Sequence, residues 1–277
     1  MATLEFTKMH GIGNDFVVVD AVRNVWTHDA STVSQKVNDR RFGIGGNGLI
    51  LIEKGASAPF KMRMFNPDGS EPEMCGNGIR CVARFIHDEG LSAENPIAIE
   101  TGAGILSLQV MDGGTVRVDM GKERHLRRDI PMAGDPAMTS VGFEIEAAGR
   151  RLRAVAVNMG NPHCIVFVDD VSSVPLDEWG PAIECHEMFP NRTNVHFMQV
   201  ISPTELRMRT WERGAGATLA CGTGACAVGV AAELSGVAGN DVLIHLPGGD
   251  LRVEIAEDRT VFMTGSASYV YKGEFEV

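Results

Sequence analysis

The sequence predicts an α+β protein of two similar, duplicated domains, each a curled, mostly antiparallel sheet around one central helix. Three pairs of segments resemble each other in the same order along the 277 residues. They are MHGIGNDFVVVD and VNMGNPHCIVFVDD, then FKMRMFNPDGSEPEMCGNGIRCVARFI and LRMRTWERGAGATLACGTGACAVGVAA, then IETGAGILSLQVMDGGTVRVDMG and IHLPGGDLRVEIAEDRTVFMTG. The second member follows the first by 144 to 147 residues in every pair. A constant offset of this kind indicates an internal repeat.

Strands are expected first in each half. Apolar runs that alternate with polar residues, or that are rich in β-branched residues, predict strands at 16–20, 49–53 and 61–65. Later turn sequences, Asp-Gly-Gly at 112–114 and Pro-Gly-Gly at 247–249, predict hairpins. Many strands and one helix per half favour an α+β domain.

A central helix lies between these strands in each half. Apolar residues at helical spacing predict the two helices, and a glycine is expected to end each of them. The two stripes are Ile79, Val82, Ala83 and Ile86, ended by Gly90, and Ala225, Val228, Gly229 and Ala232, ended by Gly236.

The repeat also predicts domain boundaries. We expect a first domain at 1–121, joined by a returning C-terminal strand at 266–277, and a second domain at 122–265. The segment 122–151, charged and then rich in Pro and Gly, is expected to hold the crossover between the halves.

Composition excludes several classes of function. The formal net charge is −11 and the chain has no long run of Lys or Arg, so nucleic acid and anionic membrane surfaces are not expected as partners. No signal peptide and no apolar stretch of membrane-spanning length is visible. The six cysteines lack Cys-x-x-Cys spacing, which argues against a zinc site and favours reduced thiols in the cytoplasm.

Two cysteines stand out by position. Cys75 and Cys221 occupy equivalent places in the repeat, directly before Gly-x-Gly at the start of each central helix. A helix N-terminus carries a partial positive charge and unpaired N–H groups, so it favours a thiolate and binds anions. The other four cysteines, Cys81, Cys164, Cys185 and Cys226, are expected to be buried packing residues.

The pair suggests inversion of a carbon centre. If the two helix starts face one anion site, one thiolate can take a proton from an α-carbon while the opposite thiol returns one. Amide donors at both helices would stabilise the charge on the α-carboxylate. The two thiols would titrate as a coupled pair in opposite protonation states.

These motifs resemble those of the diaminopimelate epimerases. The segments that carry the resemblance are MHGIGNDFVVVD, FNPDGSEPEMCGNGIRC, NMGNPHC, NRTNVHF and WERGAGATLACGTGACA, spread over almost the whole chain. The resemblance implies two similar domains with the active site in the cleft between them. It also implies a cofactor-independent enzyme that interconverts LL- and meso-diaminopimelate in lysine biosynthesis. Such an enzyme binds no metal, works in the cytoplasm (or the plastid stroma of a plant), and can form a homodimer.

The resemblance assigns roles residue by residue. Cys75 and Cys221 would be the catalytic thiols, and His163 and Glu212 would tune their protonation. Groups at the helix starts would bind the substrate's α-carboxylate: Gly76, Asn77, Gly222 and Thr223. Other polar residues would hold the remaining carboxylate and the ammonium groups: Asn14, Asn66, Asn161, Asn194, Glu212 and Arg213.

Three positions depart from the family pattern. Family members often have Asp at position 47 and some have Gln at 48, where this chain has Asn47 and Gly48; many have Glu at the position of Ala217. We therefore expect no substrate contact from residue 48, no structural ion pair from residue 47 and altered hydrogen bonding around residue 217.

Other functions are weighed against this one. A proline or hydroxyproline racemase would share the fold and the two thiols, and a redox-sensing thiol pair would need no substrate. A phenazine-type isomerase would lack the cysteine pair. A pyridoxal-dependent racemase needs a Schiff-base lysine, and none of the six lysines (8, 36, 54, 61, 122 and 272) lies in either cysteine motif.

Overall fold

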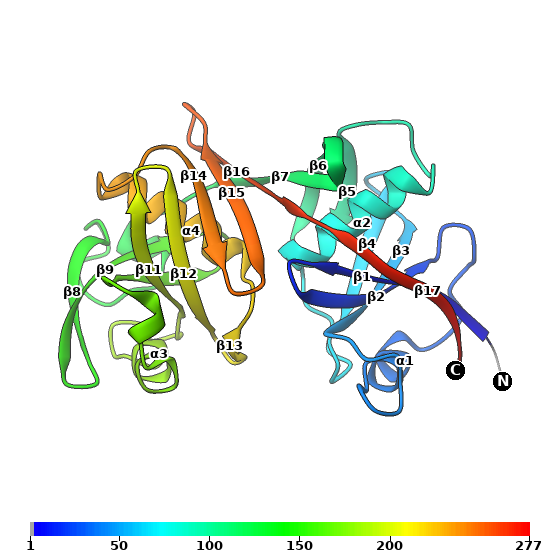
Figure 1. Ribbon diagram of the computed structural model, residues 1–277, viewed down its shortest axis with the longest axis horizontal. Coiled ribbons are helices and arrows are strands. Elements are labelled where there is room, and N and C mark those ends of the chain that lie inside the picture. The colour runs from blue at the N-terminus through cyan, green and yellow to red at the C-terminus, as the bar shows by residue number, and fades with distance from the viewer. Residues whose placement is uncertain (1–2) are drawn as a thin grey trace. The chain divides into compact units, whose positions relative to one another are not determined.

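The computed structural model describes residues 3–277. The chain divides into two compact units (Figure 1): unit 1 runs up to Val118 and includes Gly265–Val277, and unit 2 is Asp119–Thr264. Each unit is described by itself below.

Unit 1 is one curved sheet that encloses a helix. Its elements are β1 (Thr3–Gly11), β2 (Asn14–Asp20), α1 (Ala30–Val37), β3 (Gly48–Lys54), β4 (Phe60–Phe65), α2 (Gly76–Asp88), β5 (Ile97–Thr101), β6 (Gly104–Val110), the short 3-10 turn η1 (Asp112–Gly114), β7 (Thr115–Lys122) and β17 (Ser268–Glu276). The strands pair in the order β17-β1-β2-β3-β4-β5-β6-β7. Only β2–β3 and β4–β5 are parallel in this series.

The last strand of the chain belongs to unit 1. β17 pairs antiparallel with β1 from Thr3–Glu276 to His10–Ser268. Figure 1 shows this red strand running along the dark blue β1. The two ends of the chain therefore build one edge of the same sheet.

Unit 2 has the same construction. Its elements are η2 (Arg127–Asp129), β8 (Val141–Ala147), β9 (Arg150–Asn158), β10 (Pro162–Phe167), η3 (Val171–Ser173), α3 (Leu176–Glu184), β11 (Asn194–Ser202), β12 (Glu205–Glu212), β13 (Gly216–Thr218), α4 (Gly222–Leu234), β14 (Asp241–Leu246), β15 (Gly249–Ile255) and β16 (Thr260–Ser266). The strands pair in the order β8-β9-β10-β11-β12-β14-β15, with β13 also on β12.

The pairing pattern confirms the predicted duplicated α+β fold. In both units the senses follow one sequence: antiparallel, antiparallel, parallel, antiparallel, parallel, antiparallel. Each parallel step needs a crossover connection. One helix, α1 or α3, makes the first crossover, and the central helix, α2 or α4, makes the second.

The two central helices are buried to different degrees. α4 contacts β9, β10, β11, β12, β14 and β15, and its residues 224–232 are all buried. An apolar helix of this kind fits the inside of a sheet. α2 contacts β1, β2, β4 and β6 and keeps polar residues along one side.

The outer helices pack on the other face of each sheet. In unit 1, Val33 and Val37 of α1 join Val17, Leu49 and Leu51 in one apolar cluster. In unit 2, Trp179 and Ile183 of α3 join Phe189, Val195 and Phe197. Each sheet therefore packs against apolar side chains on both faces, and this packing fixes the position of the central helix relative to its strands.

Two expectations differ from the structure. The segment 122–151 is more than a crossover, because it contains β8, which pairs with β9 as β17 pairs with β1. Cys185 is exposed at the C-terminal end of α3, whereas Cys81, Cys164 and Cys226 are buried as expected.

Candidate active site

Both central helices begin at the cysteines singled out by the repeat. Cys75 is the N-cap of α2 and Cys221 is the N-cap of α4, each with an extended backbone. Their carbonyls accept the first helical hydrogen bonds, from Ile79 N and Ala225 N, both at 2.9 Å. No side-chain oxygen caps either helix. The first-turn amides therefore lie beside each thiol, where a helix leaves N–H groups without helical partners.

The start of α2 is held by a buried arginine. Arg80 has no exposed surface, and its guanidinium donates to Asn77 Oδ1 and to Gly76 O, both at 2.9 Å. The end of β1 packs directly on this turn, because a Cβ at Gly11 would lie 2.8 Å from Asn77 O. Arg80 thus fixes Asn77 with its amide oxygen toward the protein.

Asn14 is oriented in a similar way at the start of β2. Its Oδ1 accepts from Asn47 Nδ2 at 2.9 Å, and Asn47 Oδ1 accepts from Arg40 at 2.9 Å. Arg40 and the buried Lys8 both pair with Asp15 at 2.7 Å. These two cations outweigh burial, which alone would raise the pKa of Asp15, and hold that pKa below its usual value. Asn47 therefore makes no ion pair, as expected, and instead links Arg40 to Asn14 by hydrogen bonds.

Asn66, after β4, and Gly48, at the start of β3, differ in role. Asn66 is half-buried, and its side chain donates to Ser70 Oγ at 3.0 Å in the turn after β4. A Cβ at Gly48 would lie 2.8 Å from Met64 Cε and 3.1 Å from Phe65 O. Met64 therefore occupies the space that a side chain at 48 would take.

In unit 2, a chain of polar side chains runs through the sheet behind Asn161. His163 Nε2 lies 2.7 Å from Asn161 Oδ1, and its Nδ1 lies 2.8 Å from His196 Nε2. His196 Nδ1 is 3.0 Å from Thr210 Oγ1. Both imidazoles are completely buried. Burial lowers the pKa of His163 well below its usual value, with further lowering by His196 and Arg213, and burial lowers that of His196 to about 3.

Hydrogen bonds to Asn194 and Glu184 hold the loop that carries Glu212 and Arg213. Asn194 Oδ1 accepts from Arg213 N at 3.0 Å, while its Nδ2 donates to Pro162 O at 2.9 Å. Glu184, at the end of α3, accepts from Trp211 Nε1 at 2.7 Å and from Gly214 N at 3.2 Å. The loop is therefore held on both sides of Glu212 and Arg213.

Glu212 lies next to the second thiol. Its Oε1 accepts from Thr218 Oγ1 at 2.6 Å, and Ala217 pairs with Trp211 in the short strand β13. The side chain of Ala217 is exposed. Glu212 thus obtains its hydrogen bond within this hairpin from Thr218.

The environment of Cys221 corrects one expectation. Cys221 is 5% exposed. Burial raises the pKa of its thiol well above the usual value, and the Glu212 carboxylate raises it further; hydrogen bonds from Gly224 N and from Thr223, whose Oγ1 lies 3.7 Å from Sγ, act in the opposite direction. Burial and Glu212 outweigh the helix start, which was expected to favour the thiolate.

The structure therefore forms two groups of the predicted residues. Unit 1 brings together Cys75, Gly76 and Asn77 at α2 and places Asn14 and Asn66 at strand ends; unit 2 brings together Asn161, His163, Asn194, Glu212, Arg213, Cys221, Gly222 and Thr223. Four supporting residues were not predicted from the sequence: Arg80, Glu184, His196 and Thr210. Only Arg80 had a local signal, because it follows Gly76 and Asn77 at helical spacing.

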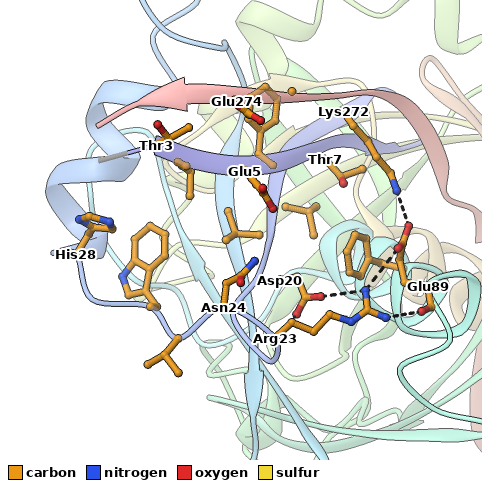
Figure 2. Close-up of a pocket in the computed structure, with 18 residues that line it drawn as sticks. Thr3, Glu5, Thr7, Asp20, Arg23, Asn24, His28, Glu89, Lys272 and Glu274 are labelled. Atoms are coloured by element: carbon orange, nitrogen blue, oxygen red, sulfur yellow. Dashed lines mark hydrogen bonds and ion pairs between the residues drawn. The ribbon is translucent and has the colours of Figure 1, made fainter. Parts of the chain in front are cut away.

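A cavity lies elsewhere in unit 1. It has a volume of about 910 Å³ and is lined by β1, β2, β17 and the end of α2. Figure 2 shows Arg23 reaching from its wall to Asp20 and Glu89, and Lys272 reaching to Glu89. Glu89 follows the C-terminal end of α2, and the 13-residue helix separates it from Cys75 by about 20 Å. This cavity is not the site of the two helix starts.

Residues 3–277 contain neither a group of side chains suited to a metal ion nor a helix suited to crossing a membrane. No cluster of three His, Cys, Asp or Glu side chains could hold a metal ion there. No helix in that range is long and apolar enough to cross a membrane.

Comparison with known proteins agrees with the motifs. The family profile described as "Diaminopimelate epimerase" matches residues 6–126 and 155–270. The diaminopimelate epimerase of Desulfitobacterium hafniense is 50% identical over 98% of this chain and 97% of its own length. That of Pelotomaculum thermopropionicum is 49% identical over 98% of this chain and 99% of its own.

A solved structure of another family has the same fold. A phenazine biosynthesis protein of the PhzF family from Bacillus anthracis aligns over all of both chains with a TM-score of 0.73 at 19% identity, a level that shows the fold alone. The family profile and the relatives near 50% identity go further, and they agree with the resemblance carried by the cysteine motifs: the chain belongs to the diaminopimelate epimerase family.

Proposed function

We propose that this chain interconverts LL-diaminopimelate and meso-diaminopimelate in lysine biosynthesis without pyridoxal phosphate, and that Cys75 and Cys221 are its two acid–base groups. One observation carries the proposal: the two thiols occupy the same N-cap position of the two duplicated central helices, in a chain of this family.

The chemistry needs one group on each face of the α-carbon. One thiolate takes the α-proton, and the electron pair left on carbon is delocalised into the α-carboxylate. The opposite thiol then donates its proton to the other face of the carbon. The first cysteine ends as a thiol and the second as a thiolate, so the reverse reaction uses the same residues in exchanged roles.

The helix starts supply the donors that this step requires. Backbone N–H groups at Gly76, Asn77, Gly222 and Thr223 are proposed to bind the α-carboxylate, where charge grows in the transition state. The glycines allow the carboxylate to approach the backbone closely.

The remaining polar residues are proposed to recognise the rest of the substrate. Asn14, Asn77 and Asn161 each have Oδ1 held by a protein donor or ring nitrogen, an orientation that suits their NH₂ groups to carboxylates. Asn66 and Asn194 extend this polar set, Arg213 suits a carboxylate, and Glu212 suits an ammonium group.

Cys221 is proposed to be the resting acid, tuned by His163 and Glu212. Burial and the Glu212 carboxylate both raise the pKa of its thiol, so the protonated form is favoured. His163 is neutral at this position, because burial lowers its pKa and His196 and Arg213 lower it further, so it does not counter the effect of Glu212.

Location and assembly are also proposals. The mechanism needs reduced thiols, which favours the cytoplasm. A homodimer is proposed through strand β17, whose Val270 and Tyr271 are 55% and 46% exposed. Light scattering of wild type and a Val270→Glu, Tyr271→Glu variant tests it: an unchanged mass would contradict this interface.

A substrate panel with cysteine variants tests the activity. Pure protein in reducing buffer is incubated with LL-diaminopimelate, L-proline or trans-4-hydroxy-L-proline, and the stereoisomers are separated. We expect turnover of diaminopimelate alone, and a loss of roughly 10²- to 10⁴-fold in Cys75→Ala and in Cys221→Ala. The exposed Cys185→Ala is the matched control and should keep full activity. Turnover of a proline substrate instead would favour the racemase alternative, and no turnover would favour the redox one.

A further inference from the structure

His196 connects the proposed site to the interior of unit 2. It lies on β11, has no exposed surface, and stands between His163 and Thr210 at hydrogen-bond distance from both. Its ring also touches the start of α4: a Cβ at Gly224 would lie 2.3 Å from His196 Cε1 and 3.0 Å from Cys221 Sγ. The imidazole of His196 therefore occupies the space left by the missing side chain of Gly224 in the first turn of α4.

The hydrogen bonds that link Thr210, the two histidines and Asn161 all point in the same direction. Asn161 Oδ1 can only accept, so His163 Nε2, 2.7 Å away, carries the proton. Since His163 is neutral, its Nδ1 must accept, and the proton between the rings lies on His196 Nε2. His196 is neutral too, so its Nδ1 accepts from the Thr210 hydroxyl. The donors thus run from Thr210 through both rings to Asn161.

The direction decides what Asn161 offers to a ligand. With Oδ1 occupied by His163, the NH₂ group remains, and within residues 3–277 it donates to no protein acceptor. If the Thr210 hydroxyl were lost, both rings could change tautomer and the side-chain amide of Asn161 could flip by rotation. Asn161 would then present its oxygen to the ligand, and this oxygen repels a carboxylate.

We propose that His196, oriented by Thr210, is a positioning residue that fixes the tautomer of His163 and thereby keeps the Asn161 NH₂ group directed at a substrate carboxylate. The proposal rests on the proposed function for the identity of that carboxylate. The tautomers of the two rings are properties of the protein alone, so that part of the proposal is independent of the proposed function.

Four variants separate hydrogen bonding from packing. His196→Gln keeps a donor near the position of Nε2, and His196→Phe keeps the ring without either nitrogen. Thr210→Ser keeps the hydroxyl, and Thr210→Val keeps the shape without it. His245→Phe is the control, because His245 lies on β14 and pairs with Glu205 and Asp250, away from this chain of hydrogen bonds. Thermal melts identify the variants that fold.

The first readout is the tautomer of each ring. Long-range ¹H–¹⁵N spectra of histidine-labelled protein, with His163→Gln and His196→Gln to assign signals, report which nitrogen is protonated. We expect Nε2–H at both rings of the wild type and a changed His163 signal in His196→Phe. The proton on Nδ1 of either ring in the wild type would overturn the proposal.

The second readout is the split between KM and kcat for LL-diaminopimelate. Loss of a donor to a buried group corresponds to a rise in KM of about tenfold, expected in His196→Phe and Thr210→Val. His196→Gln, Thr210→Ser and the control should stay within about threefold of wild type. An unchanged KM in folded His196→Phe would also overturn it. Wild-type protein that turns over no diaminopimelate would instead reject the proposed function, and the tautomers would then decide this inference alone.

Discussion

Cys221 combines two features that oppose each other: it caps a helix, and it is buried beside a carboxylate. Burial is the largest influence on its pKa and Glu212 the next, and both raise it. This suits the proposed role of Cys221 as a proton donor, since a raised pKa favours the protonated thiol. Glu212, which is proposed to bind the substrate's ammonium group, is therefore also a residue that raises the pKa of this thiol.

Replacing Glu212 should make Cys221 easier to ionise. In Glu212→Gln we expect the pKa of the Cys221 thiol to fall toward, and stay above, its usual value, because burial remains. The rate of iodoacetamide alkylation of the Cys221 peptide, measured by mass spectrometry from pH 6 to 10, should rise at lower pH than in wild type. Glu205→Gln, on the same strand, is the control. Superimposable pH–rate curves for Glu212→Gln and wild type would refute the role of the carboxylate.

Asn47 shows how a neutral residue acts where many family members have an aspartate. It accepts from Arg40 and donates to Asn14, a pair of roles that an aspartate could not fill. In Asn47→Leu, Asn14 loses its donor, and we expect KM for LL-diaminopimelate to rise roughly threefold to tenfold with a smaller change in kcat. Steady-state kinetics measure this, with Asn24→Leu as an exposed control. A wild-type KM in both variants would contradict the prediction.

At the scale of elements, the two central helices differ in how their first turns are supported. In α2, a buried arginine holds the turn; in α4, the His196 ring lies against it. Gly78 and Gly224 occupy equivalent positions, but their neighbours differ. A Cβ at 78 would meet the mobile end of Ile50 at 2.9 Å, whereas one at 224 would meet a ring held at both nitrogens.

A matched pair of alanine substitutions tests this difference. We expect Gly224→Ala to lower the free energy of unfolding by about 1–3 kcal/mol, as overpacking does, and to reduce kcat as Cys221 shifts. Gly78→Ala should cost less, since Ile50 can move and alanine favours a helix. Urea denaturation of both variants measures the order, and an equal or larger loss in Gly78→Ala would be inconsistent with a rigid His196.

Much of this element-level description was available from the sequence. The repeat located both helices and both cysteines because glycine turns and apolar stripes are local signals. β8 was missed because segment 122–151 is charged and punctuated by Pro and Gly, which hides a strand whose pairing is decided by β9. Glu184 and His196 were missed because their partners lie 14 to 33 residues away, and only the folded sheet brings them together.

At the scale of the whole molecule, duplication gives two helix starts of the same geometry and different electrostatics. One has a buried guanidinium nearby, and the other has a carboxylate and two neutral imidazoles. The neutral imidazoles also link stability to pH. Their pKa values are lower in the folded protein than the usual 6.5 of an unfolded chain, so the unfolded state binds more protons below that pH.

Acid should therefore destabilise the fold before its carboxylates titrate. Below about pH 6.5 each buried imidazole disfavours the folded state, and a pKa near 3 for His196 corresponds to a loss of about 2 kcal/mol at pH 5. Denaturant unfolding at pH 7.5 and 5.0 should show a smaller drop for His196→Gln than for wild type. Equal drops in both proteins would mean that His196 is not neutral by burial.

The central proposal is that one thiolate removes the α-proton while the opposite thiol donates a proton to the other face of the carbon, and solvent isotope incorporation tests it most directly. Wild-type protein is incubated with LL-diaminopimelate in D₂O, and both stereoisomers are analysed by mass spectrometry during the first few per cent of conversion. Two bases predict one deuterium in every meso product molecule and almost none in the recovered LL substrate, because the group that removes a proton is not the one that returns deuterium. Deuterium entering the recovered substrate as fast as the product would indicate a single base, and the absence of meso product would contradict the activity itself.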